Sequence, residues 1–297
     1  MTKENEALMT KKIQSPVKDE GGLATPALEE MLTAGVHFGH QKRRWHPRIA
    51  GYLYQTGGKI HIFDLVKTRA MLDRASRALF EVAALNGPII FVGTKRQAAE
   101  ILKAQAVSCG AYFVNRRWLG GTITNFDSVR QKLNRLKKIE EGLKDGGQFS
   151  AYTKKEKLDL SRELAKLEEG VGGLKGLTGL PKALFVVDIK REATAVAEAR
   201  KKKIPVVAIV DSNCSPDLVD FPIPGNDDSA RSIELMLTAV SAAVKSGHQQ
   251  FSKNQESTVK LVAKSEEKKS QKKMSKAVKV GKTVAKKSKA RTKKSKK

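Results

Sequence analysis

Short apolar runs rich in β-branched residues alternate with helical stretches through much of the chain. The runs cover residues 88–92, 111–114, 183–187 and 205–210. Runs of this length are typical of strands buried on both faces of a parallel sheet, with the helices as crossovers. The pattern predicts an α/β fold class with a doubly wound, Rossmann- or flavodoxin-like, mostly parallel sheet. Function is then sought first among residues at the carboxyl ends of the strands.

Two further elements are predicted before this core. Thr25-Pro26 resembles an N-cap followed by proline at the first helical position, so a short helix is expected, ending at Gly35. Apolar residues at 52–54 and 60–63 flank Gly57-Gly58, which indicates a hairpin or two neighbouring strands.

Helical spacing continues after the hairpin and returns at the end of the core. Leu72, Ala75, Leu79 and Val82 predict a helix that Asn86-Gly87 closes. A last helix is expected from about Asp228 to Lys245.

The segment between Trp118 and Pro181 interrupts the alternation, because it contains two helical stretches and no credible strand. Apolar residues repeat at 3-4-3 spacing from Phe126 and at 4-3-4 spacing from Leu160. We expect an inserted antiparallel coiled-coil hairpin at about residues 122–178, with helices of about 17 residues that rise about 25 Å. The alternative is an arm packed back on its own domain.

Composition and charge divide the chain into three parts. Residues 1–24 are polar and lack periodicity, so we predict a flexible N-terminal arm. Residues 25–250 form the predicted α/β domain, and 251–297 a disordered Lys-rich tail. From residue 252 onward the tail holds 18 basic and 3 acidic residues, so the remainder keeps +11 of the net charge of +26. This excess favours a polyanionic partner over a small neutral ligand.

The cysteines and the hydropathy bound the cellular context. Cys109 and Cys214 form no CxxC pair, which suggests neither a disulfide framework nor a cysteine-based zinc site. The N-terminus matches neither a secretory nor a transit signal, and no apolar stretch approaches about 20 residues. We expect a cytoplasmic protein without a membrane partner.

Signals for nucleotide binding are weak. Gly93-Thr94-Lys95 follows a strand and opens a helix, so its amides suit one phosphate, but GxGxxG is absent. Gly281-Lys282-Thr283 imitates the end of a P-loop, yet Lys276 stands where glycine is required. We expect no cofactor and no small-molecule substrate.

Candidate catalytic and metal-binding residues are also weak. Asp64, Asp188 and Asp211 follow apolar runs, but each precedes a helix or turn, where Asp commonly caps free amides. The histidines at 37, 40, 46 and 61 match no standard metal site. We expect no catalysis and no bound metal, and interpret the histidines as packing or RNA-contacting groups.

Two loops mix cations with aromatic rings, at residues 41–48 and 115–121. Arginine forks pair with phosphate oxygens, and each ring stacked on an unpaired base contributes about 1–3 kcal/mol. The alternative is that both tryptophans are buried anchors and the cations are merely solvated. The predicted RNA-binding residues are His37, His40, Lys42, Arg43, Arg44, Trp45, Arg48, Lys95, Arg96, Asn115, Arg116, Arg117 and Trp118.

Several separated blocks resemble the bacterial-type small-subunit ribosomal protein S-two family. The first is Ala34-Gly35-Val36-His37-Phe38-Gly39-His40-Gln41, with Arg44-Trp45-His46-Pro47 after it. Further blocks lie in the expected order at 60–65, 91–95, 115–121, 124–126, 180–188, 205–213 and 222–228. The resemblance covers roughly residues 27–247. The N-terminal arm and the Lys-rich tail depart from the family's compact pattern.

The resemblance implies a structural, non-enzymatic component of the small ribosomal subunit, docked on its rRNA between head and body. It also implies neighbouring ribosomal proteins as partners, among them the mRNA-binding ribosomal protein S-one, recruited through the hairpin and nearby surface. The tail adds an alternative, since a Lys-rich chain binds any nucleic acid nonspecifically by releasing counterions. That alternative is a nucleoid-type DNA- or RNA-binding protein.

Overall fold

The computed structural model describes residues 25–57, 59–144, 147–149 and 152–255. The chain divides into two units, 1–249 and 250–297. The predicted N-terminal arm and nearly all of the predicted tail lie outside the described residues. Both sheets and the inserted helices belong to the first unit, whereas the predicted domain bounds stay predictions.

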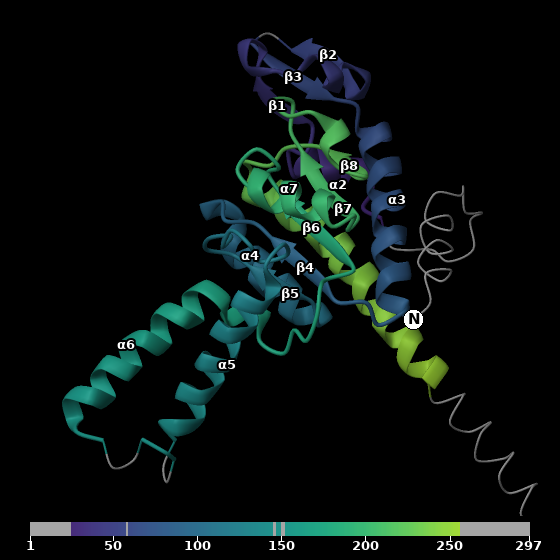
Figure 1. The fold of residues 1–297 in the computed structure, drawn as a ribbon. Coiled ribbons are helices and arrows are strands. Elements are labelled where there is room, and N and C mark those ends of the chain that lie inside the picture. The colour runs from purple at the N-terminus through teal and green to yellow at the C-terminus, as the bar shows by residue number, and fades with distance from the viewer. Residues whose placement is uncertain (1–24, 58, 145–146, 150–151, 256–297) are drawn as a thin grey trace, which may run out of the picture. The chain divides into compact units, whose positions relative to one another are not determined.

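A five-stranded parallel sheet forms the centre of this unit (Figure 1). Its strands are β4 (Ile89–Val92), β5 (Tyr112–Val114), β6 (Ala183–Val187), β7 (Val206–Val210) and β8 (Phe221–Pro224). The order β5-β4-β6-β7-β8 places the reversal of strand order between β4 and β6. The predicted α/β class and its four strands are confirmed. The fifth strand, β8, was not predicted, because its sequence Phe-Pro-Ile-Pro contains two strand-breaking prolines.

Helices cover both faces of the sheet, as the doubly wound pattern requires. One core cluster joins the sheet to α3 (Leu65–Ala84), α4 (Arg96–Cys109) and the helix at 230–255. The other joins the opposite face to α7 (Ala193–Lys201). Neighbouring residues of β4 divide between the clusters, with Phe91 in the first and Ile90 in the second. This is the alternation expected of a strand buried on both faces.

A smaller antiparallel sheet precedes α3, with the order β1-β3-β2. Strands β2 (Leu53–Gly57) and β3 (Ile60–Phe63) are the predicted hairpin. Strand β1 (Phe38–Gln41) was not predicted, because its residues do not alternate between apolar and polar. In Figure 1 the small sheet lies beyond the end of α3 at which that helix begins.

The first described helix, α2 (Leu28–Thr33), begins later than predicted. Ala27 rather than Thr25 occupies the N-cap position, and its backbone N–H donates to Glu30 Oε2 over 3.0 Å. The Thr25 cap was therefore wrong. The Glu30 carboxylate satisfies the free amide that a Thr25 hydroxyl was expected to bind, and Gly35 follows the helix in the left-handed region at φ 75°.

The inserted segment is a pair of helices, α5 (Phe126–Gly142) and α6 (Lys154–Val171), which lie side by side and extend away from the sheet (Figure 1). The predicted capping box is present, with Thr153 N donating to Glu156 Oε2 over 2.9 Å. Arg135 and Glu163 join the helices through two hydrogen bonds of 2.8 Å. The supercoiled packing of a true coiled coil stays a prediction.

Candidate nucleic-acid interface

The carboxyl edge of the parallel sheet gathers the segments that the sequence singled out. Because all five strands run in the same direction, the residues that follow β4, β5 and β7 meet at this edge. The small sheet joins them there, since His40 N donates to Ser212 Oγ over 2.8 Å and His46 N to Ser212 O over 2.7 Å. The loops at 41–48, here the basic loop, and at 115–121, here the tryptophan loop, therefore share one edge.

The basic loop presents its cations to solvent. Lys42, Arg43 and Arg44 form an exposed 3-10 turn, and no ion pair or hydrogen bond engages their side chains among the described residues. The Trp45 side chain is 40% exposed, and its ring lies 5.1 Å from that of His61, tilted by 30°. The His61 ring thus contacts one part of the indole while another part is open to solvent. An indole in this arrangement can stack on a base.

Arg48, the last residue of the basic loop, has a different environment. Its guanidinium forms an ion pair with Asp217, and both side chains are exposed. Such pairs contribute little to stability and are easily exchanged for a phosphate partner. Arg48 therefore stays available for an anion.

The tryptophan loop is built around Glu198, a residue of α7. Its carboxylate accepts five hydrogen bonds of 2.7–3.1 Å, from the Trp118 indole, the amides of Gly121, Ile123 and Thr124, and the Thr124 hydroxyl. Burial alone would raise the pKa of Glu198, but these donors outweigh it and hold the pKa below its ordinary value. Sequence reasoning missed Glu198, because nothing in a helical Ala-Glu-Ala-Arg segment indicates a partner 80 residues away.

In this arrangement Trp118 is buried, whereas the two arginines that precede it are exposed. Trp118 is 7% exposed, so its ring has no open face for a base, and we regard it as an anchor of the loop. Arg116 and Arg117 are exposed, with Glu100 3.9 Å from Arg116. Asn115 donates its side-chain amide to Ala99 O over 3.2 Å. The predicted RNA contact through the Trp118 ring is therefore not supported, whereas the two arginines face solvent.

Lys95 and Arg96 are adjacent in the sequence but differ in burial and in the partners of their side chains. The Lys95 side chain is 12% exposed, and its Nζ lies 2.7 Å from Asp227, 2.6 Å from Asp228 and 3.4 Å from Asp188. Burial would lower the Lys95 pKa, but the three carboxylates together raise it. With three anionic partners Lys95 is poorly placed to bind a phosphate, while Arg96 is exposed.

Hydrogen bonds within the protein weaken the nucleotide-binding hypothesis further. The amide of Thr94, which a phosphate would need, donates to Glu192 Oε1 over 3.0 Å. Asp188 accepts the amides of Lys190 and Arg191, and Asp64 those of Val66 and Lys67. Both aspartates are caps, as the sequence indicated.

The four histidines do not converge on one centre. His37 packs on Phe38 with ring centroids 3.9 Å apart, and burial lowers its pKa. His46 Nδ1 accepts the amide of Arg48, and the His61 ring packs on Trp45. His40 alone faces carboxylates, those of Asp211 and Asp228. His37 and His40 are thus half-buried, and their predicted role in RNA contact stays a prediction.

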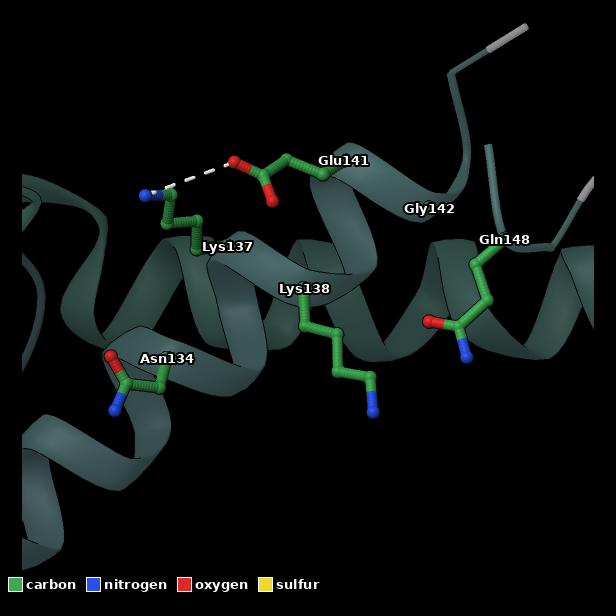
Figure 2. A pocket seen from close by; sticks show the side chains of 6 residues that line it. All are labelled: Asn134, Lys137, Lys138, Glu141, Gly142 and Gln148. Atoms are coloured by element: carbon green, nitrogen blue, oxygen red, sulfur yellow. Dashed lines mark ion pairs between the residues drawn. The ribbon is translucent and has the colours of Figure 1, made fainter. Parts of the chain in front are cut away.

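A hollow on the hairpin offers little chemistry. Figure 2 shows it near the end of α5, lined by Asn134, Lys137, Lys138, Glu141, Gly142 and Gln148. Lys137 and Glu141 form an ion pair of 3.8 Å across one helical turn. Such an exposed pair is ordinary for a helix surface. Every helix among the described residues is too short or too polar to span a bilayer.

Comparison with known proteins identifies the family. The model of a family described as Ribosomal protein S2 matches residues 31–247. The chain is 45% identical over 241 residues to "Small ribosomal subunit protein uS2" of Endomicrobium trichonymphae, covering 81% of this chain and 98% of that relative. It is 48% identical over 220 residues to the protein of the same name from Dinoroseobacter shibae, covering 74% and 84%. The chain therefore belongs to the ribosomal protein S2 family.

Proposed function

We propose that this chain is a structural, non-enzymatic constituent of the small ribosomal subunit and binds the rRNA of that subunit. One observation supports this most directly: exposed cations and a half-open indole lie along a single edge of the sheet, on loops that buried contacts hold in place. The residues are Lys42, Arg43, Arg44, Trp45, Arg48, Arg96, Arg116 and Arg117.

The physical argument concerns preorganisation as much as charge. Flexible cations attract RNA but lose conformational freedom when they bind, at about 0.5–1.5 kcal/mol for each ordered side chain. Here Glu198 fixes the backbone of the tryptophan loop, and the Ser212 carbonyl fixes the basic loop by accepting a hydrogen bond from His46 N. The backbone that carries the arginines therefore starts from a defined position and only their side chains are ordered on binding, which favours recognition of a particular RNA shape over nonspecific attraction.

The finer parts of the proposal rest on the family resemblance. We place the chain between the head and body of the subunit, in cytoplasmic ribosomes, with the α5–α6 pair as the surface that helps to recruit ribosomal protein S-one. The long exposed faces of both helices are consistent with a protein partner.

The experiment is to sediment a cell lysate at low magnesium, wash the separated subunits in high salt, and quantify this protein in every fraction by mass spectrometry. Near one copy per washed small subunit supports the proposal. Release of most copies into the soluble or DNA fraction would contradict it and favour the nucleoid alternative. Specific contacts survive the wash, whereas binding by counterion release weakens steeply with salt.

A further inference from the structure

We propose that the amino edge of the parallel sheet is a docking surface for an acidic segment of another protein that also carries aliphatic side chains. The exposed residues of this amino-edge surface end α3 or α7, or precede β6 or β7. They are Leu85, Leu180, Lys182 and residues 200–203. The surface lies beyond the proposed RNA-binding function, which uses loops at the opposite edge of the sheet.

Hydrogen bonds between neighbouring strands bring these segments together. Lys182 N donates to Pro88 O over 2.7 Å, and Leu184 N donates to Pro205 O over 3.0 Å. The segments that lead into β4, β6 and β7 therefore lie next to one another, as the starts of paired parallel strands do. Lys182 also lies against the turn after α3, because a Cβ on Gly87 would be 3.0 Å from the Lys182 Cβ. The amino-edge surface is thus formed by adjoining segments.

The amino-edge surface carries five positive charges. Lys182 and residues 200–203 are exposed, and among the described residues no ion pair or side-chain hydrogen bond engages any of these five side chains. Asp220, directly before β8, accepts the amide of Val206 over 2.8 Å and is therefore committed to the backbone. Neighbouring like charges repel one another unless an anion compensates them. The surface is complementary to a run of carboxylates.

Lys203 carries its charge at a conformational cost. It follows α7 in the left-handed region at φ 55°, where a side chain is unfavourable and glycine is the usual residue. Its backbone N–H donates to Arg200 O over 3.1 Å, which closes the turn. The left-handed residues after α3 and α4 are Asn86 and Gly110, two residue types that tolerate this conformation. A lysine in a strained position indicates a role for its side chain outside the fold.

The competing interpretation is that these cations only stabilise the C-terminus of α7. Positive side chains in the last turn interact favourably with the helix dipole, and Arg200 and Lys201 occupy that turn. The dipole does not account for Lys182, which belongs to another segment, or for the lysine at position 203, where glycine is favoured. Helix stabilisation therefore explains only part of the cluster.

The aliphatic side chains favour a protein partner over RNA. Leu85 is 58% exposed and Leu180 is 42% exposed. Their burial stabilises a complex when the partner also offers apolar surface, which a phosphate–ribose backbone lacks. Unpaired bases would instead stack on exposed rings, and the exposed aromatic residues of the described chain lie on the small sheet, the basic loop and the hairpin.

The occupant belongs to another protein rather than to this chain. Residues 1–24 hold four acidic and four basic residues, and the tail from residue 252 holds 18 basic and 3 acidic residues. A second copy has the same positive excess, so two copies repel each other. A partner segment rich in Asp and Glu, with leucine, isoleucine or valine between them, supplies both the charge and the apolar contact.

The test is site-specific photocrosslinking of the full chain in growing cells. Leu180→p-benzoylphenylalanine places a crosslinker within the amino-edge surface, and mass spectrometry identifies what it captures on irradiation. Val66→p-benzoylphenylalanine is the matched control, since Val66 is 65% exposed but lies at the start of α3, at the opposite edge.

A second pair of variants tests the dependence on charge. Capture at position 180 is repeated with Lys202→Ser and Lys203→Gly added, and separately with Lys154→Ser and Lys155→Ser, which remove two exposed lysines at the start of α6. Lys203→Gly relieves the left-handed strain, so this variant should unfold at a temperature no lower than the parent. Thermal unfolding thus separates a lost contact from a lost fold.

We expect position 180 to capture a protein segment with a net negative charge. The yield should fall by at least about fivefold with Lys202→Ser and Lys203→Gly and stay unchanged with the α6 pair, and position 66 should not capture the same segment. Crosslinks to RNA would assign the surface to a nucleic acid and overturn the proposal. A neutral or basic segment, a second copy of this chain, no capture, or a yield independent of the lysines would overturn it as well.

Discussion

At the scale of single residues, Glu198 holds the tryptophan loop in place. Its five hydrogen bonds are made to donors that lie within seven residues of one another, from Trp118 to Thr124. Their amides have no comparable acceptor if the carboxylate is lost. The conformation of Arg116 and Arg117 therefore depends on a buried group that touches neither side chain.

Glu198→Gln tests this dependence. The amide group of glutamine turns an N–H toward donors that need an acceptor, so we expect a loss of about 2–4 kcal/mol in the free energy of unfolding. Urea denaturation measures it. Glu234→Gln, on an exposed position of the last helix, is the control and should change stability by less than about 0.5 kcal/mol. Equal effects of the two substitutions would refute the role of Glu198.

The depressed pKa of Glu198 gives a pH dependence of known sign. The carboxylate contributes its full stabilisation above its unfolded pKa of about 4.3, and this is lost as pH falls through the lower folded value. In a Trp45→Phe background Trp118 is the only tryptophan, so acrylamide quenching reports on its burial. Quenching should rise below about pH 4 and become independent of pH in that range in Glu198→Gln.

At the scale of elements, we expect the contribution of a cation to RNA binding to depend more on the edge of the sheet at which it lies than on its charge alone. Arg116 and Arg117 follow β5 at the carboxyl edge, whereas Lys201 and Lys202 end α7 before β7 begins, at the opposite edge. Both pairs are exposed and carry the same charge. They form a matched comparison for the proposed interface.

Arg116→Ala with Arg117→Ala should weaken incorporation into small subunits more than Lys201→Ala with Lys202→Ala, and more than deletion of everything after Phe251. The reason is that only the first pair lies at the carboxyl edge of the sheet, on a loop that Glu198 holds in place, whereas the lysine pair lies at the opposite edge and the tail is predicted from its sequence to be disordered. Competition against the parent chain in an assembly assay measures the effect. In RNA binding, the slope of log affinity against log salt concentration should become shallower by the amount expected for the loss of about one to two phosphate contacts. A larger defect from the tail deletion would show that the interface is assigned to the wrong part of the chain.

The base of the hairpin offers another element-level prediction. A Cβ on Gly173 would lie 2.1 Å from Phe113 O on β5, while one on Gly179 would meet nothing within 4 Å. Gly173→Ala must therefore displace the 3-10 turn at 172–174, which follows α6, from β5, and we expect a loss of about 2–3 kcal/mol in the free energy of unfolding, measured by thermal or urea unfolding. Gly179→Ala should be close to neutral. A neutral Gly173→Ala would mean that the hairpin base is not packed on β5.

At the scale of the whole molecule, the sequence predicts the buried centre better than its rim. Continuous apolar runs identify β4, β6 and β7, because strands buried on both faces leave no room for polar residues. The edge strand β5 is also apolar, although two of its three residues are only partly buried. The rule does not identify strand β8, because β8 pairs on one side only and an edge strand can contain proline. Strand β1 escaped it because its residues are only partly buried.

The two Arg-Arg-Trp segments show where local prediction of the site stops. Residues 43–45 and 116–118 have the same sequence, yet Trp45 is 40% exposed and Trp118 is 7% exposed. The difference comes from Glu198, which reaches the second segment and not the first. The cations of both segments were predictable as exposed groups, whereas the burial of each ring depends on residues far away in the sequence.

The prolines of β8 have a consequence for the protein before it meets any partner. Gly225 N donates to Val210 O over 3.1 Å, so by strand alternation positions 222 and 224 direct their backbone nitrogens away from β7. Proline has no N–H, so the open side of the last strand lacks the donors that a further strand would need at both positions. A strand from another copy could therefore form fewer hydrogen bonds at this edge, which disfavours aggregation of newly made chains through it.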